Sequence, residues 1–285
     1  MLLVVRVSAE EPTYEMAAHV LSPIAGTNTE SEDPQTGASS PSRDTQAATG
    51  PDNKSLLRRG LDDQKQIYLA PLHRKNIKWD LLFLAGTGGL IAADPHISRH
   101  VPRDGIDISR DISNAGLYST SAVVAGLLIY GVKNDDSHAR ETGVFALESL
   151  TNTAAVLALI QVTAGRQRPT EGDGYGRFWR DNTLGSSFPS AHSSFTWTMA
   201  SVLAHEYPKP WVQWLAYGTA TAVSVTRVTG LKHFSADVEV GGVFGYLIGR
   251  QVFHSHCSLG LNPRCHASKN NSLSEELPNL DAGAR

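Results

Sequence analysis

Six apolar stretches dominate the middle of this 285-residue chain and constrain what it can fold into. They are rich in Ala, Leu, Val and Gly, and none alternates apolar with polar residues as a half-buried strand would. Runs containing Gly, Pro, Asn and Asp separate them as turn signals. The pattern predicts an all-α fold, a bundle of about six helices. The stretches are residues 79–93, 112–132, 144–164, 192–206, 211–227 and 236–253.

The two flanks differ from this helical region in composition. Residues 22–55 are mainly Ser, Thr, Pro, Gly and Asp, so they cannot bury enough apolar surface to offset the entropy cost of ordering. Near the start, a short apolar run precedes Val7-Ser8-Ala9, which resembles the end of a signal peptide without its full apolar region. We therefore expect a signal remnant and disordered segment at 1–60, a helical domain at 70–255, and a polar tail at 259–285.

Charge and cysteine content exclude two broad classes. The formal net charge of −3 gives no sign of a nucleic-acid-binding surface. Two cysteines, Cys257 and Cys265, are too few for a disulfide framework, but they allow one late disulfide in an oxidising compartment.

Two locations fit the apolar stretches, a membrane domain and a soluble or surface-bound bundle. Residues 112–132 carry no charge and could span a bilayer, which takes about 20 mainly apolar residues. The stretches 144–164 and 236–253 each contain polar or acidic residues. These interruptions favour the soluble or surface-bound bundle.

Three polar motifs stand at predicted helix boundaries. They are QVTAGRQRP at 161–169, PSAH at 189–192 and TRVTGLKHFSAD at 226–237. Pro189 suits the first turn of a helix, and the neighbouring serines suit its N-terminal end. A helix start carries partial positive charge and free N–H groups, so the PSAH segment predicts an anion site.

The residue types in these motifs fit phosphate binding. Arg168 and Arg227 each offer a planar fork of N–H donors to phosphate oxygens. The predicted helix start adds the Ser190 hydroxyl and the backbone N–H of Ala191. These groups together predict a cradle for a phosphoryl group.

The histidines of the motifs fit phosphoester cleavage. His233 and Asp237 are four residues apart, so a carboxylate can meet the imidazole if this segment is close to helical. A carboxylate on one ring nitrogen fixes the tautomer and leaves the other nitrogen free to attack. His192 can protonate the leaving oxygen. This set predicts cleavage through a phosphohistidine intermediate.

The order R-P, P-S-x-H and R-x5-H-x3-D resembles the type-2 phosphatidic acid phosphatase and vanadium-dependent haloperoxidase superfamily. The resemblance covers about residues 75–255 and includes the six-helix layout. It implies a phosphatase that acts on a phosphorylated small molecule or lipid phosphate, without a metal or other cofactor, in the bacterial cell envelope. The loop 172–179 would lie over the pocket mouth. The implied roles are nucleophile for His233, its orienter for Asp237, general acid for His192, and phosphate ligands for Arg168, Arg227, Ser190, Ala191 and Gln161.

Three positions depart from the family pattern. Gln161 stands where the family has Lys, seven residues before the Arg of the first motif, so one positive charge is lost. Arg166 or Lys232 could compensate, although neither is at the matching position. Ala191 replaces the usual Gly and Thr226 replaces a common Ser, and we expect both effects to be small.

Three other functions compete with a phosphatase. A vanadate-dependent haloperoxidase would use the same cradle for vanadate as a cofactor, whereas vanadate would inhibit a phosphatase. A catalytically weak phosphate- or lipid-binding protein is favoured by Gln161. A purely structural helical membrane protein leaves the three motifs unexplained.

Two further features have competing interpretations. A tail rich in histidine and cysteine could bind zinc, but it lacks the tight paired spacing of structural zinc sites. The GTGG run at 86–89 follows no strand, so we expect it to allow close helix packing rather than to bind a dinucleotide. The tail residues are His254, His256, Cys257, Cys265 and His266.

Overall fold

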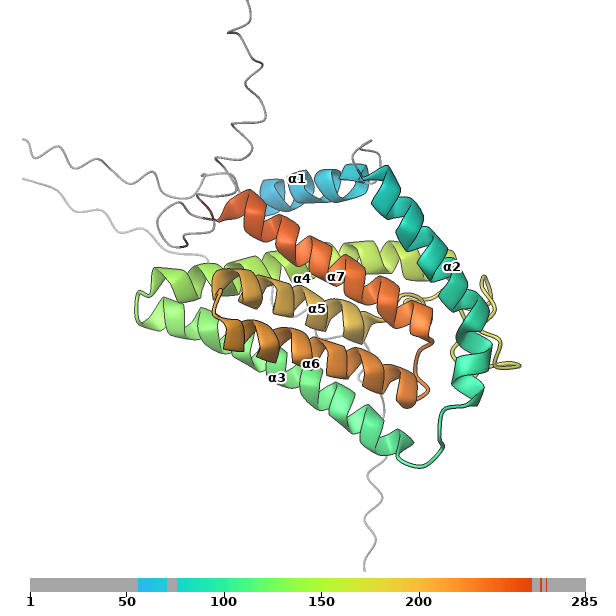
Figure 1. The fold of residues 1–285 in the computed structure, drawn as a ribbon. Helices are drawn as coiled ribbons and strands as arrows, with labels where there is room; N and C mark the ends of the chain where they lie inside the picture. The colour runs from blue at the N-terminus through green and yellow to red at the C-terminus, as the bar shows by residue number, and fades with distance from the viewer. Residues whose placement is uncertain (1–55, 71–75, 258–261, 263–264, 266–285) are drawn as a thin grey trace, which may run out of the picture. The chain divides into compact units, whose positions relative to one another are not determined.

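The computed structural model describes residues 56–70, 76–257, 262 and 265, and all regular elements in these residues are helical (Figure 1). The prediction of an all-α fold is therefore confirmed. The expectations for the first 55 residues and for most of the tail lie outside the described residues. The helices are α1 (Leu56–Leu69), α2 (Ile77–Arg99), α3 (Ile106–Lys133), α4 (Ser137–Ala164), α5 (Ala191–Glu206), α6 (Pro210–Thr229) and α7 (Ser235–His256).

The six apolar stretches correspond to α2–α7, and α1 is an additional helix. Its sequence LLRRGLDDQKQIYL mixes charged with apolar residues, so it has no continuous apolar run to reveal it. The expected boundary at residue 60 is therefore too late, since α1 begins at Leu56.

Helices α2–α7 run alternately up and down the bundle (Figure 1). The ends of α2, α4 and α6 therefore lie at the same end of the bundle as the starts of α3, α5 and α7. All three polar motifs fall at this end. Gly165 in the left-handed conformation ends α4 there and lets the chain leave the helix within the first motif.

Close contact between α5 and α7 brings two of the motifs together. Gly241, Gly245 and Gly249 recur every four residues on the face of α7 that meets α5. A Cβ atom on Gly245 would overlap the carbonyl oxygen of Ser194 on α5. These glycines let the two backbones approach closely, and they hold the start of α5 beside the start of α7.

The GTGG run has no such role, which corrects our expectation for it. A Cβ atom on Gly86, Gly88 or Gly89 would meet no atom within 4 Å outside its own helix segment. The run lies on α2, where nearby large apolar side chains such as Leu82 and Leu84 are exposed. The three glycines face open space, whereas Thr87 between them is buried and its hydroxyl donates to Glu239 on α7.

Two helices, α3 and α4, are long and apolar enough to cross a membrane. The apolar window of α3 is only 17% buried inside the protein, compared with 44% for α4. Large apolar side chains are also exposed on α2 and α6, including Trp79, Trp211 and Trp214. An exposed surface of this kind suits contact with lipid.

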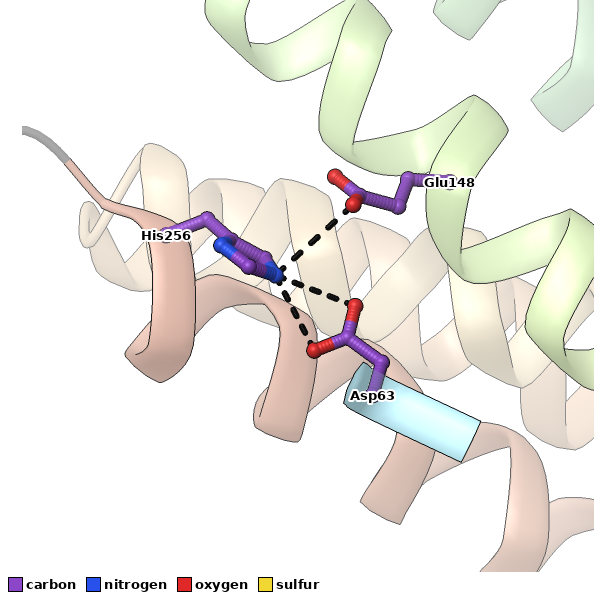
Figure 2. A group of neighbouring side chains, drawn as sticks. All are labelled: Asp63, Glu148 and His256. Carbon is purple, nitrogen blue, oxygen red and sulfur yellow. Dashed lines mark hydrogen bonds and ion pairs between the residues drawn. The ribbon is translucent and has the colours of Figure 1, made fainter. Parts of the chain in front are cut away.

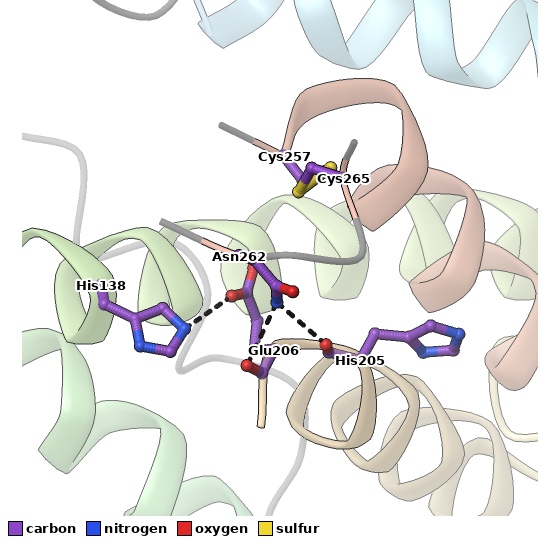
Figure 3. Close-up of a disulfide and its surroundings, with 6 residues drawn as sticks. All are labelled: His138, His205, Glu206, Cys257, Asn262 and Cys265. Carbon is purple, nitrogen blue, oxygen red and sulfur yellow. Dashed lines mark hydrogen bonds and ion pairs between the residues drawn. A yellow bond between two sulfur atoms is a disulfide. The ribbon is translucent and has the colours of Figure 1, made fainter. Parts of the chain in front are cut away.

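The cysteines of the tail pair with each other (Figure 3). Cys257 follows α7, and its disulfide to Cys265 leaves neither sulfur free as a thiolate ligand. The Asn262 amide donates hydrogen bonds to the backbone carbonyls of His205 and Glu206 at the end of α5. The two cysteines are therefore not available as zinc ligands, and the one late disulfide is present.

Candidate active site

The PSAH motif forms the start of α5. Ser190 is the N-cap, and its hydroxyl accepts a hydrogen bond from the backbone N–H of Ser193. The helix itself begins at Ala191, so Pro189 precedes the cap rather than lying in the first turn. The backbone N–H of Ser190 donates to the carbonyl of Asp237 at 3.0 Å, which ties this start to α7.

His233 is buried, and its hydrogen bond defines one tautomer. Its Nδ1 lies 2.8 Å from the carbonyl oxygen of Ser187. A carbonyl can only accept, so Nδ1 carries the proton and Nε2 keeps its lone pair. A nucleophilic role requires this arrangement.

Asp237 reaches the imidazole indirectly, which corrects the expected direct pair. Its Oδ2 lies 3.7 Å from Nδ1 of His233, beyond hydrogen-bond distance. The same Oδ2 accepts hydrogen bonds from the Ser187 hydroxyl and from the backbone N–H of Phe234. Asp237 therefore holds the Ser187 side chain and the backbone of Phe234, the residue after His233, while the Ser187 carbonyl orients the ring.

Burial lowers the pKa of His233 well below the ordinary histidine value. The positive charges of Arg168, Arg227 and Lys232 lower this pKa further, because they disfavour a second cation nearby. His233 is therefore a neutral imidazole at neutral pH. The same cations would stabilise a phosphoryl group beside it.

The two cradle arginines converge from different segments. Arg168 follows α4, and its guanidinium donates to the carbonyls of Lys232 and Gly185. Arg227 lies in the last turn of α6, is almost fully buried, and contacts the Ser113 hydroxyl at 3.4 Å. Both charges act on His233, so the first and third motifs meet at this point.

Arg166 does not supply the charge missing at position 161. Its guanidinium is fully buried and pairs with Asp94 at 2.8 Å and with Asp237 at 2.7 Å. It also lies over the ring of Phe234. Both carboxylates use this guanidinium, so it anchors the loop after α4 to α2 and α7 instead of facing a phosphate.

Gln161 lies in the last turn of α4 and is buried. Its side-chain amide donates to the backbone carbonyl of Pro189 at 3.1 Å. The backbone carbonyl of Gln161 accepts a hydrogen bond from the Ser186 hydroxyl. The residue therefore contacts the PSAH segment directly.

His192 lies in the first turn of α5, half-buried. Its Nε2 is 3.0 Å from the side-chain oxygen of Asn114 on α3. Asn114 follows Ser113, which contacts Arg227. This chain of contacts connects the second motif to the arginine of the third motif.

A cavity of about 330 Å³ opens next to the cradle. Pro169 and Leu231 line it. Pro169 directly follows Arg168, and Leu231 lies two residues before His233. Residues 172–174 form another wall, whereas none of the predicted site residues is among the described residues that line the cavity. Arg99 at the end of α2 and Arg103 beyond it add positive charge.

The model of the PAP2 superfamily matches residues 142–258, which contain all three motifs. Residues 142–258 of this chain belong to the PAP2 superfamily.

Two individual proteins are similar to parts of the chain. Lipid A 1-phosphatase from Porphyromonas gingivalis is 30% identical over 77 residues, which are 26% of this chain and 17% of that protein. A transmembrane PAP2-type phosphatidylglycerolphosphate phosphatase of known structure, from Bacillus subtilis, is 17% identical. Its alignment covers 73% of this chain and 100% of that one, with a TM-score of 0.41.

The PAP2 segment contains every predicted site residue, but sequence reasoning missed three that support them. Asp94 lies outside the matched segment, on α2, and Asn114 lies on α3. The sequence indicates only a helix-capping role for Ser187. No spacing rule pairs its carbonyl with the imidazole of His233, which lies 46 positions later. The one signal in the sequence was the position of Asp94, an acidic residue directly after the apolar stretch 79–93.

Proposed function

We propose that this chain is a phosphatase that hydrolyses a phosphomonoester or diphosphate, with lipid phosphates as the favoured class. The observation that carries the proposal is a buried, neutral His233 with Nε2 free, beside two arginines and a helix start. Membership of the PAP2 superfamily supports it, as do the lipid phosphatase activities in the names of the two similar proteins. The exposed apolar surface supports a substrate delivered from a membrane.

In the proposed first step, Nε2 of His233 attacks phosphorus while the bond to the leaving oxygen breaks. His192 gives its proton to that oxygen, so the alcohol or phosphate leaves without a full negative charge. Arg168, Arg227 and the N–H groups at the start of α5 stabilise the charge on the phosphoryl oxygens. In the second step His192 takes a proton from water, the water oxygen attacks phosphorus, and the P–N bond breaks to release phosphate.

The role of His192 predicts a dependence on the leaving group. His192→Ala should lower kcat by about 10²–10⁴ for alkyl phosphates, which need a proton on the departing oxygen. The loss should be smaller for aryl phosphates, because phenolate leaves without help. Steady-state rates on both ester types test this, and equal losses would contradict the role.

The functional experiment is a phosphate-release screen over lipid and soluble esters, with and without detergent. We expect turnover that continues in EDTA, because arginines and N–H groups supply the cradle charge, and we expect vanadate to inhibit. Phosphate binding without turnover would replace this proposal with a binding protein. Loss of the reaction in EDTA at a temperature where the protein stays folded, restored by zinc or magnesium, would overturn the mechanism.

We further propose that the site faces the periplasm of a bacterial envelope. The disulfide lies at the opposite end of α7, and disulfides persist in oxidising compartments such as the periplasm. Among the described residues, α7 is not one of the helices apolar enough to cross a membrane, so both of its ends can lie on the periplasmic side. An Arg180→Cys variant lacking both native cysteines should react with an impermeant maleimide in intact cells, and reaction only after lysis would place the site inside.

A further inference from the structure

A second cluster of polar side chains lies at the other end of α7 from His233. Asp63 on α1, Glu148 on α4 and His256 at the end of α7 point toward one another (Figure 2). Their side chains are 1%, 7% and 16% exposed, respectively. None of them belongs to the three phosphate-site motifs.

One proton on His256 cannot satisfy the oxygens that surround it. Nε2 of His256 lies 3.0 Å from both carboxylate oxygens of Asp63 and 3.7 Å from Oε1 of Glu148. A single N–H can point at the Asp63 carboxylate, but it then leaves Oε1 of Glu148 without a donor. Oε1 of Glu148 is buried and has no hydrogen-bond partner among the described residues. A buried carboxylate oxygen without a hydrogen-bond partner indicates that a ligand such as a metal ion binds there.

We propose that Asp63, Glu148 and His256 bind a divalent transition-metal ion. The candidate ligand atoms all lie within 4.8 Å of one another. Ligands about 2.1 Å from a zinc ion in a tetrahedral site are about 3.4 Å apart, so shifts on the order of 1 Å would complete the site. Two carboxylates with one imidazole suit Zn²⁺ or Mn²⁺ better than Mg²⁺, which prefers oxygen ligands alone.

Neighbouring residues leave the required atoms available. Arg59 donates to Oε2 of Glu148 at 2.9 Å, so Oε1 stays directed at His256. Asn152 donates to Oδ2 of Asp63 at a long 3.3 Å, and Oδ1 lies 3.0 Å from Nε2 of His256. The second-sphere contacts therefore orient both carboxylates without occupying the atoms that face the cluster.

The ion would hold α1 against the bundle. The other described polar contacts of α1 with the bundle are few, chiefly those of Arg59, Gln64 and Gln66. A bound ion would link α1 to both α4 and α7 and would stabilise the folded chain without taking part in phosphate chemistry. The two sites therefore make separate predictions, because this one changes stability rather than the bond-breaking step.

The test is zinc binding to the full chain, purified in detergent and stripped with EDTA. We expect one Zn²⁺ per chain by calorimetry and a higher Tm with Zn²⁺ or Mn²⁺ than with Mg²⁺. Glu148→Gln and His256→Gln should each weaken zinc binding by more than about tenfold and abolish the rise in Tm. Asp62→Asn changes the neighbouring carboxylate outside the cluster and should bind zinc like the wild type.

Two results would overturn the proposal. One is a stripped wild-type chain that binds no Zn²⁺ and shows no change in Tm with any of the three ions. The other is a Glu148→Gln chain that binds zinc as tightly as the wild type, which would place the ion elsewhere. If His256→Gln does not fold, Glu148→Gln alone decides, since its amide keeps the size and shape of the carboxylate.

Discussion

At the scale of single residues, Ser187 contacts both His233, the proposed nucleophile, and Asp237, its proposed positioning residue. Its carbonyl accepts the Nδ1 proton of His233, and its hydroxyl donates to Asp237. Asp237 in turn pairs with Arg166, which pairs with Asp94. The orientation of the nucleophile thus depends on a buried network that joins three segments distant in sequence.

The pH dependence of kcat/KM should reveal how the positive charges around His233 affect its pKa. Its lowered pKa keeps the imidazole neutral below the ordinary histidine range, so the acid limb of kcat/KM should have its midpoint below pH 6.5. Lys232→Gln removes one of the charges that lower this pKa, so the midpoint should rise. Lys232→Arg keeps the charge and should leave it unchanged. A midpoint that is the same in both variants would show that Lys232 does not act on the nucleophile.

Position 161 should tolerate, and benefit from, a lysine. The Gln161 amide donates to the Pro189 carbonyl, and an ammonium could make the same bond while adding a full charge beside the start of α5. Charged hydrogen bonds contribute about 1.5–3 kcal/mol, against about 1 kcal/mol for neutral ones. We expect Gln161→Lys to tighten vanadate inhibition several-fold.

The neutral variant Gln161→Met is the control, since it removes the donor and adds no charge. It should weaken vanadate inhibition. Unchanged vanadate inhibition in both variants would show that residue 161 does not lie at the site. Weaker vanadate inhibition of the Gln161→Lys variant would show that another positive charge already occupies this position.

At the scale of elements, the contact between α5 and α7 sets the distance between His192 and His233. The glycines of α7 permit this contact because their missing side chains leave room for the backbone of α5. The apolar runs predicted both helices, but the closeness of their backbones was not predicted. It depends on which face of each helix meets the other.

Gly245→Ala tests this contact. Its Cβ would overlap the Ser194 carbonyl, so one helix must move, and overpacking of this kind costs about 1–3 kcal/mol. We expect a lower Tm and reduced kcat, because the two motifs separate. Gly89→Ala is the matched control, because its Cβ meets open space and alanine favours a helix. Equal effects on Tm in the two variants would contradict this account of the packing.

At the scale of the whole molecule, the sequence predicted the bundle and the three motifs that line its site. Apolar runs of helical length and the turn signals between them located α2–α7, whereas the mixed composition of α1 gave no such run. Motif order located His233, Arg168 and Arg227. The carbonyl of Ser187 and the pairing of Asp94 with Arg166 could not be predicted, because they arise only when distant segments pack together.

The central claim is that the assembled site transfers a phosphoryl group to Nε2 of His233. The most direct test is to mix the chain with a ³²P-labelled phosphate ester, quench in alkali during turnover, and map the label by mass spectrometry. We predict label on His233, lost in His233→Ala together with all but a few per cent of the activity. Label on another residue, or a His233→Ala chain that keeps substantial turnover, would contradict the account.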